Sequence, residues 1–385
     1  MFDNRSRWLL GLIVVPIVLL LKFAGLLPDQ KYHGSEYRDA PAKAGKSNVE
    51  YLFQRGVEAL DAQDNDGAVS YFSQVIARAP DEAAAYANRG IAYDHLKDYE
   101  RALADFDKAV RLEPEKSDAY FNRGMCYFNH EDYDRALPDF DEAIRRHGNN
   151  ADYFVYRGQA RGAKNNLEQA LADFDEALRL DPQNARACGA RGLAHLKKKD
   201  YQRALADYGK GIELDPKDSA AYIGRGDVYA ALNDFEQAAA DLTTAIRLDD
   251  KNPEAYLARG WIRENQHDYQ RAIDDYTAAI GLKDKELQAY NNLAWIWATC
   301  PKMQFRNAAT ALEYGLHICK ASEWKKTAFF DTLAAAYAAN GNFAQAVLWQ
   351  KKAVAAPDAY DSEEERQKGQ RRLKLYEQGK SYTDD

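Results

Sequence analysis

The chain has 385 residues, of which 46% are hydrophobic and 29% charged, and its formal net charge is −8. The acidic residues are spread along the chain, and no basic stripe is available to meet phosphates, so we expect no nucleic-acid partner. The four cysteines, Cys126, Cys188, Cys300 and Cys319, form no CxxC pair and match no zinc-binding spacing. They are predicted to be buried structural thiols, with no metal site.

The first 27 residues predict a membrane anchor. Arg5 and Arg7 precede an apolar run from Trp8 to Leu21, and apolar character resumes after Lys22. Residues 8–27 are long enough to cross a hydrocarbon core of about 30 Å. A cleaved signal peptide is the competing interpretation, but no good cleavage triplet of small residues directly follows the run. We expect an uncleaved signal anchor over residues 1–27.

The side of the membrane on which the rest of the chain lies is less strongly indicated. Arg5 and Arg7 favour an amino terminus in the cytoplasm. Basic residues beyond the apolar run weaken this preference: Lys31, Arg38, Lys43 and Lys46. We expect the folded body to lie outside the cytoplasm, joined to the anchor by a flexible linker over residues 28–48 that is rich in Gly, Pro, Ala and Lys.

From Ser47 onward the sequence repeats with a period of 34 residues. An Arg-Gly pair opens the pattern, an Ala follows twelve residues after the Gly, and a large apolar residue stands four residues further on. The spacing of 4 and 3 residues between apolar and small side chains places them on one face of a helix, so each repeat is predicted to form two helices. One such helix pair buries too little apolar surface to fold alone, so stability must come from neighbouring repeats.

A 34-residue helix-turn-helix unit with these rows of small and aromatic residues resembles the tetratricopeptide repeat family. The resemblance implies an all-α fold, a right-handed superhelical solenoid of about nine units whose first helices line a concave groove. We expect seven regular units over residues 49–286 and two further units over residues 287–360, with a longer loop around Pro301. A charged capping helix and tail follow over residues 361–385.

The segment after Tyr290 resembles the terminal module of bacterial tetratricopeptide proteins, through its Ala-Trp and Ala-Thr-Cys-Pro arrangement. Together with the predicted anchor, this resemblance implies a single-pass protein of a bacterial inner membrane with its repeats on the periplasmic side.

An Asp stands sixteen residues after the Arg in six of the repeats. These pairs are Arg89 and Asp105, Arg123 and Asp139, Arg157 and Asp173, Arg191 and Asp207, Arg225 and Asp241, and Arg259 and Asp275. The arginines could bind an acidic partner, or they could pair with the aspartates inside the fold. Because the two residue types occur in equal number at a fixed offset, we expect a structural Arg-Asp ladder.

The family resemblance implies that the residues three before and one after each Gly face the groove. Many of them are apolar here: Phe53, Val57, Ile91, Phe121, Met125, Val155, Ile223, Leu257, Trp261 and Trp295. Exposed, such a stripe would mark a protein-binding surface, although the same side chains could instead pack between neighbouring first helices. The resemblance also implies that Asn88, Asn122 and Asn292 hold the backbone of an extended peptide.

No nucleotide-binding, zinc-protease or nucleophile motif occurs in the sequence, so we expect no enzyme and no cofactor. The basic clamp that the family uses for a carboxylate terminus is missing, which favours an apolar or amphipathic peptide as ligand. We therefore expect a membrane-anchored scaffold that binds proteins through its groove. The alternative is a structural, self-associating protein whose groove is filled by its own linker or by another copy.

Overall fold

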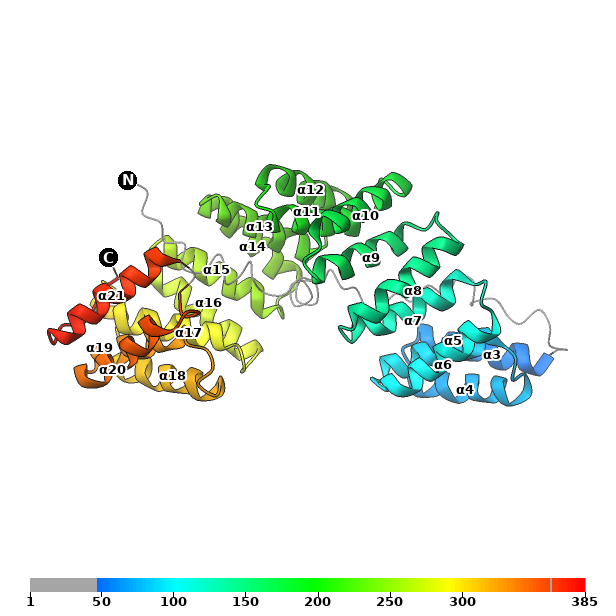
Figure 1. Cartoon of the computed structure of the whole chain (residues 1–385), viewed down its shortest axis with the longest axis horizontal. Helices are drawn as coiled ribbons and strands as arrows, with labels where there is room; N and C mark the ends of the chain where they lie inside the picture. The colour runs from blue at the N-terminus through cyan, green and yellow to red at the C-terminus, as the bar shows by residue number, and fades with distance from the viewer. Residues whose placement is uncertain (1–46, 361, 385) are drawn as a thin grey trace. The chain divides into compact units, whose positions relative to one another are not determined.

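The computed structural model describes residues 47–360 and 362–384. Within these ranges the protein is all-helical, with 19 α-helices and no strand (Figure 1). None of the described helices is both long enough and apolar enough to cross a bilayer. The predicted anchor and most of the predicted linker lie outside the described residues.

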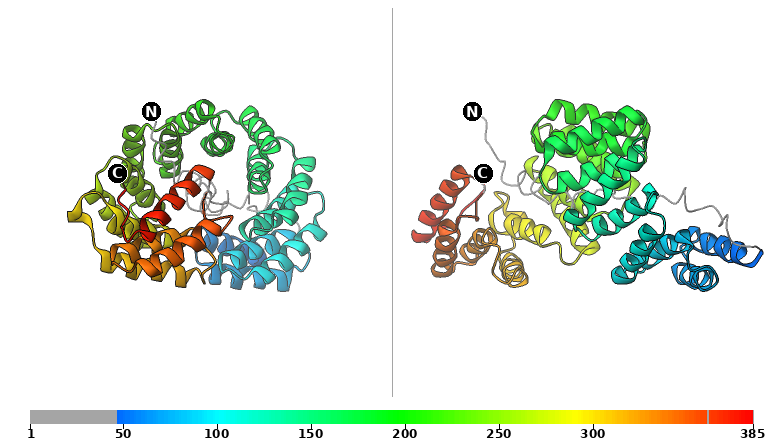
Figure 2. Two further views of the ribbon diagram at one scale, coloured as in Figure 1. Left: turned by 60° about the vertical axis from the view of Figure 1, so that its left-hand side comes forward. Right: turned by 45° about the vertical axis from the view of Figure 1, so that its right-hand side comes forward.

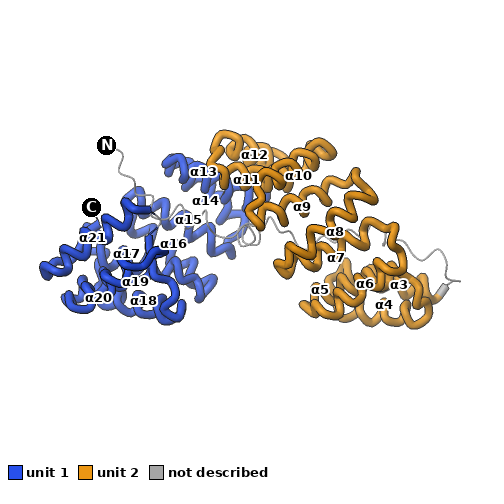
Figure 3. Tube along the Cα trace, in the orientation of Figure 1, with its two compact units in different colours: residues 1–15, 217–385 blue, residues 16–216 orange. Residues whose placement is uncertain are grey.

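The chain divides into two compact units (Figure 3). Their described parts are residues 47–216, called here the N-terminal unit, and residues 217–360 with 362–384, called the C-terminal unit. Each is a stack of antiparallel helix hairpins that follow one another in chain order (Figure 2).

The N-terminal unit contains five hairpins. They are α3 (Ser47–Asp61) with α4 (Asn65–Arg78), α5 (Ala83–His95) with α6 (Tyr99–Leu112), α7 (Ser117–Asn129) with α8 (Tyr133–Arg146), α9 (Ala151–Ala163) with α10 (Leu167–Leu180), and α11 (Ala185–Lys197) with α12 (Tyr201–Leu214).

The C-terminal unit contains four hairpins and a final helix. They are α13 (Ser219–Ala231) with α14 (Phe235–Leu248), α15 (Pro253–Asn265) with α16 (Tyr269–Leu282), α17 (Leu287–Thr299) with α18 (Ala308–Ala321), α19 (Phe329–Ala339) with α20 (Phe343–Ala355), and then α21 (Glu363–Glu377). The connector between α17 and α18 contains one short 3-10 turn, Met303–Phe305.

The turn inside each hairpin is built from local backbone bonds and a helix cap. In the second hairpin the Lys97 N–H donates to the Asp94 carbonyl and the Asp98 N–H to the Tyr93 carbonyl, which is the Schellman arrangement that ends a helix. Lys97 adopts the left-handed region, with φ 61°. The Asp98 side chain then accepts from the Arg101 N–H and caps the next helix. A six-residue stretch thus ends one helix and starts the other.

Glycine recurs in the first helix of the seven hairpins from α3 to α16 because a large side chain lies against it, an aromatic ring in six of them and Leu242 in the other. A Cβ atom on Gly158 would come within 2.6 Å of Phe174 Cε1, and one on Gly90 within 2.9 Å of Phe106 Cε1. Such distances are shorter than carbon atoms tolerate, so a side chain here would push the two helices apart. The predicted pairing of Gly with the aromatic row is therefore the helix-crossing contact itself.

The last helix is more than a charged cap, because one of its faces is buried. Although α21 is strongly charged, Arg372 and Tyr376 on one of its faces are each only 1% exposed. The Arg372 guanidinium donates to both carboxylate oxygens of Asp331 in α19, at 3.0 and 2.8 Å. The charged composition of α21 did not indicate that this face is buried. A charged residue such as Arg372 can occupy a buried position when it pairs with a buried residue of opposite charge.

Candidate functional site

All six sequence-predicted Arg-Asp pairs are ion pairs across the two helices of one hairpin. In the second hairpin Arg89 Nε lies 2.7 Å from Asp105 Oδ2, and Arg89 Nη2 lies 2.9 Å from Asp105 Oδ1. The shortest distances in the other pairs are 2.7 Å for Arg123–Asp139, 2.6 Å for Arg157–Asp173, 2.7 Å for Arg191–Asp207, and 2.8 Å for both Arg225–Asp241 and Arg259–Asp275. The six aspartates are buried.

Several of these arginines also reach the preceding hairpin. Arg123 Nη1 donates to Asp107 at 2.8 Å, and the bonds of Arg157 to Asp141 and of Arg191 to Asp175 repeat that geometry. Hydrogen bonding to Asp139 raises the pKa of the Arg123 guanidinium above its ordinary value. The ladder therefore ties helices within a hairpin and hairpins to one another, which leaves these arginines committed to the scaffold.

The predicted groove stripe is wrong in one respect, because its side chains are not exposed. The ten apolar members are all buried: Phe53, Val57, Ile91, Phe121, Met125, Val155, Ile223, Leu257, Trp261 and Trp295. Phe121 is representative, since its ring lies 5.7, 4.7 and 5.5 Å from the rings of Phe140, Tyr153 and Tyr156. First helices of neighbouring hairpins lie close enough for these side chains to fill the space between them, which removes apolar area from water.

The three predicted peptide-holding asparagines are buried as well. The Asn88 amide donates to the Ala84 carbonyl of its own helix at 2.9 Å. Asn292 accepts from Gln288 at 2.9 Å, and Asn122 is 0% exposed. In this structure none of them presents an amide to an extended peptide.

One member of the stripe, Trp295, lies against a non-helical segment near the end of the described chain. The last described residues, Ser381–Asp384, form no helix and run across α19 and α17. The Trp295 indole Nε1 donates to the Asp384 carboxylate at 2.8 Å, and the Asp384 backbone N–H donates to the Thr299 carbonyl at 2.9 Å. We call this segment the tail, and its contact surface on α17 and α19 the tail site.

Side chains at both ends of the tail complete its attachment. The Ser381 hydroxyl donates to the Ala338 carbonyl at 2.9 Å, and Arg306 Nη2 donates to the Thr383 hydroxyl at 2.8 Å. The Tyr382 ring lies 6.0 Å from the Trp295 ring and packs on the alanine-rich face of α19. The tail site therefore combines an apolar seat for one ring, an indole donor for one carboxylate and a guanidinium donor for one hydroxyl.

Sequence reasoning missed the tail, because Trp295 and Asp384 are 89 residues apart and the tail lies outside the repeat. No periodicity or motif connects them. The excess of small side chains on α19, where Ala334, Ala335, Ala336 and Ala338 are all buried, is the one feature of the sequence that matches the seat of Tyr382.

A family model for the tetratricopeptide repeat matches residues 53–114, 98–152, 151–219 and 223–298, which together are more than half of the chain. The chain belongs to the tetratricopeptide repeat family. This fold indicates a scaffold for protein–protein interaction, and proteins with tetratricopeptide repeats are generally not enzymes. No curated protein matches this tetratricopeptide repeat protein.

Solved structures of tetratricopeptide repeat proteins are similar to it. A tetratricopeptide repeat protein from Parabacteroides merdae is 21% identical, with a TM-score of 0.53, over 63% of this chain and 96% of that chain. PilF of Pseudomonas aeruginosa is 18% identical, with a TM-score of 0.49, over 55% of this chain and 96% of its own. YrrB, described as a repeat protein with an unusual peptide-binding site, is 27% identical, with a TM-score of 0.39, over 48% and 95%. The first of these supports the fold.

Proposed function

We propose that this protein is a membrane-anchored scaffold that binds an extended segment of a partner protein at the tail site. The observation that carries the proposal is the tail itself: four consecutive residues without regular secondary structure lie on α17 and α19, held by polar bonds and one seated ring. A surface that orders its own chain end in this way has the groups needed to order a similar segment of another protein.

The chemistry of the tail site indicates the kind of segment it accepts. Trp295 and Arg306 supply donors, and the alanine face of α19 supplies an apolar seat. A segment with an aromatic residue followed two positions later by an acidic one reproduces Tyr382 and Asp384. This is an amphipathic ligand. Its acidic group is recognised by the Trp295 indole in place of a lysine clamp, and the Arg306 guanidinium donates to the hydroxyl that precedes it.

The N-terminal segment is the basis for the proposed location of the protein at a membrane. Residues 8–27 have the length and composition of a bilayer span, and Arg5 and Arg7 favour a body outside the cytoplasm. We place the repeats on the periplasmic side of a bacterial inner membrane. Confinement to a membrane raises the effective concentration of whatever the scaffold holds.

Self-association is the second candidate, and the tail also favours it. The tail of another copy presents the same residues, so an exchanged tail would join two chains. Sedimentation of the full chain over a range of concentrations separates the candidates, because exchange gives a dimer that disappears when residues 381–385 are removed.

The function is tested by co-purification from gently solubilised membranes with three chains: the full chain, a chain ending at Lys380, and that shortened chain with Trp295→Phe. We expect the shortened chain to retain a partner more strongly than the full chain, because its site is open. Trp295→Phe keeps the ring but removes the donor to a carboxylate, a bond worth about 1.5–3 kcal/mol, so it should lower the retained amount about tenfold or more. Equal retention by all three chains would place the partner on another surface.

A further inference from the structure

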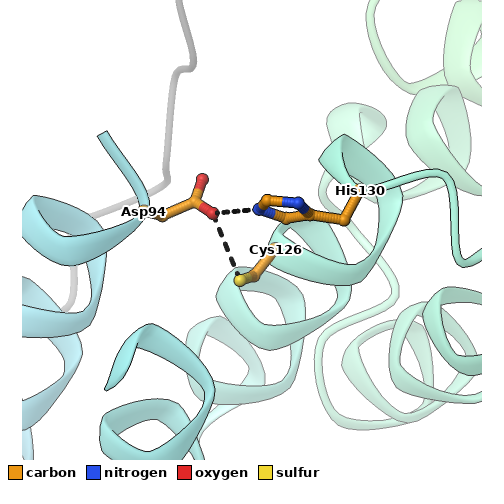
Figure 4. Close-up of side chains that lie close together, drawn as sticks. All are labelled: Asp94, Cys126 and His130. Atoms are coloured by element: carbon orange, nitrogen blue, oxygen red, sulfur yellow. Dashed lines mark hydrogen bonds and ion pairs between the residues drawn. The ribbon is translucent and has the colours of Figure 1, made fainter. Parts of the chain in front are cut away.

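Three metal-ligating side chains meet between the second and third hairpins (Figure 4). Asp94 lies in the last turn of α5, and Cys126 and His130 lie one turn apart at the end of α7. The Cys126 Sγ lies 3.3 Å and the His130 Nε2 3.1 Å from the same oxygen, Asp94 Oδ1. The ligand atoms of the three residues all lie within 4.8 Å of one another.

The repeat itself shows that packing does not require these residue types. One repeat earlier the three equivalent positions hold Leu60, Ala92 and Leu96. One repeat later they hold Phe128, Ala160 and Lys164. Neither neighbouring interface can ligate a metal, although the helices there pair in the same way.

Asp94, the acidic residue of the three, is energetically unfavourable at this buried interface. The Asp94 side chain is 0% exposed, and burying a carboxylate is unfavourable unless a charge or several donors compensate for it. Among the groups that contact Asp94 are the Cys126 thiol, the His130 imidazole and the Asn129 amide, whose Nδ2 lies 3.3 Å from Asp94 Oδ2.

We propose that Asp94, Cys126 and His130 form a binding site for a divalent cation of the zinc class. Zinc bonds of about 2.0–2.3 Å in a tetrahedron require ligand atoms about 3.3–3.8 Å apart, and the two separations from Asp94 Oδ1 are within a few tenths of an ångström of that range. Cysteine and histidine four residues apart share one helix face, and the carboxylate comes from the facing helix. The mixture of sulfur, nitrogen and oxygen ligands suits Zn²⁺ and its spectroscopic substitute Co²⁺ better than Mg²⁺ or Ca²⁺.

Binding of the cation needs only the loss of one proton and no change of oxidation state. The Cys126 thiol gives its proton to solvent and its sulfur bonds to the cation, the Asp94 carboxylate bonds through one oxygen, and neutral His130 bonds through Nε2 with its proton on Nδ1. Three protein ligands leave a fourth position, and because the His130 side chain is 33% exposed, water can reach it. The bound cation would link α5 to α7, and so fix the second hairpin to the third.

The test is a titration of the metal-free full-length chain with Co²⁺, followed by absorption. We expect one Co²⁺ per chain, with visible bands of a tetrahedral ion and a near-ultraviolet band from the thiolate, both abolished when Zn²⁺ is added. Cys126→Ser, Asp94→Asn and His130→Gln should each weaken Co²⁺ binding by at least about 100-fold, since even residues that only support metal ligands cost about 10–100-fold. Cys188→Ser is the matched control, a buried cysteine on α11, and should bind as the wild type does.

The proposal is overturned if the wild type shows no tetrahedral Co²⁺ spectrum, in which case the three side chains form only a hydrogen-bond network around Asp94. It is equally overturned if the cation binds but none of the three substitutions weakens it. Should Asp94→Asn or Cys126→Ser fail to give the helical circular dichroism of the wild type, His130→Gln decides alone, because the His130 side chain is 33% exposed and is the least buried of the three.

Discussion

Replacing Arg372 with alanine is expected to destabilise the C-terminal unit by about 3–5 kcal/mol, because it removes one partner of a buried ion pair and leaves the other charged. Arg372 is 1% exposed and Asp331 5% exposed, and two hydrogen bonds join them. Gln350 Nε2 also donates to Asp331 Oδ1 at 2.6 Å, but one neutral amide does not replace a guanidinium. Burial alone would lower the pKa of Arg372, but the negative charge of Asp331, helped by its hydrogen bond, holds that pKa above its ordinary value, so the arginine stays charged.

Urea unfolding followed by tryptophan fluorescence measures this effect, since every tryptophan among the described residues lies in the C-terminal unit. Arg371→Ala is the control, because Arg371 is the exposed neighbour on the same helix and should change the free energy of unfolding by less than about 0.5 kcal/mol. Equal midpoints and slopes for the two variants would show that the pair contributes nothing and that α21 is a solvated cap.

Phe121→Ala is expected to destabilise the N-terminal unit by about 3–5 kcal/mol, the usual cost of deleting a fully buried phenylalanine ring. Phe121 is 0% exposed and touches aromatic rings from α8 and α9. A groove residue waiting for a ligand would behave differently, because truncating an exposed side chain rarely changes stability by more than about 0.5 kcal/mol.

Hydrogen exchange of the amides in α7, α8 and α9 reports this loss locally. Leu96→Ala supplies the comparison within the same unit, since Leu96 is 40% exposed and its removal should be close to neutral. If Phe121→Ala left protection in these helices unchanged, the original expectation of an exposed stripe would be restored.

The sequence predicted the contacts that recur in every regular repeat, but few of the contacts that occur once. Gly158 against Phe174 and Arg89 against Asp105 recur at fixed offsets, so the pattern itself specifies which helices cross and which side chains meet. Burial of Phe121 was not predictable in the same way, since one helix face can serve a groove or the neighbouring hairpin equally well. The distance between successive first helices decides whether such a face is exposed in a groove or buried against the neighbouring hairpin. A repeat period of 34 residues does not predict that distance.

Contacts made only once were invisible in the sequence. Asp94, Cys126 and His130 come from two repeats and break the pattern at a single interface, so no ligand spacing within one segment revealed them. Arg372 and Asp331 are 41 residues apart, and Trp295 and Asp384 lie 89 apart, on elements that the repeat does not relate. Chain folding alone brings such residues together.

The tail site is tested most directly by titrating a labelled peptide of residues 379–385 into the chain that ends at Lys380. We expect a Kd below about 1 mM, because a tail tethered beside its site has an effective concentration in the millimolar range and must outcompete solvent there. The full chain should bind the same peptide about tenfold more weakly, since its own tail occupies the site, and Trp295→Phe in the shortened chain should also weaken binding about tenfold. No binding to the shortened chain, or equal binding to the shortened and full chains, would contradict the assignment of this surface as the peptide site.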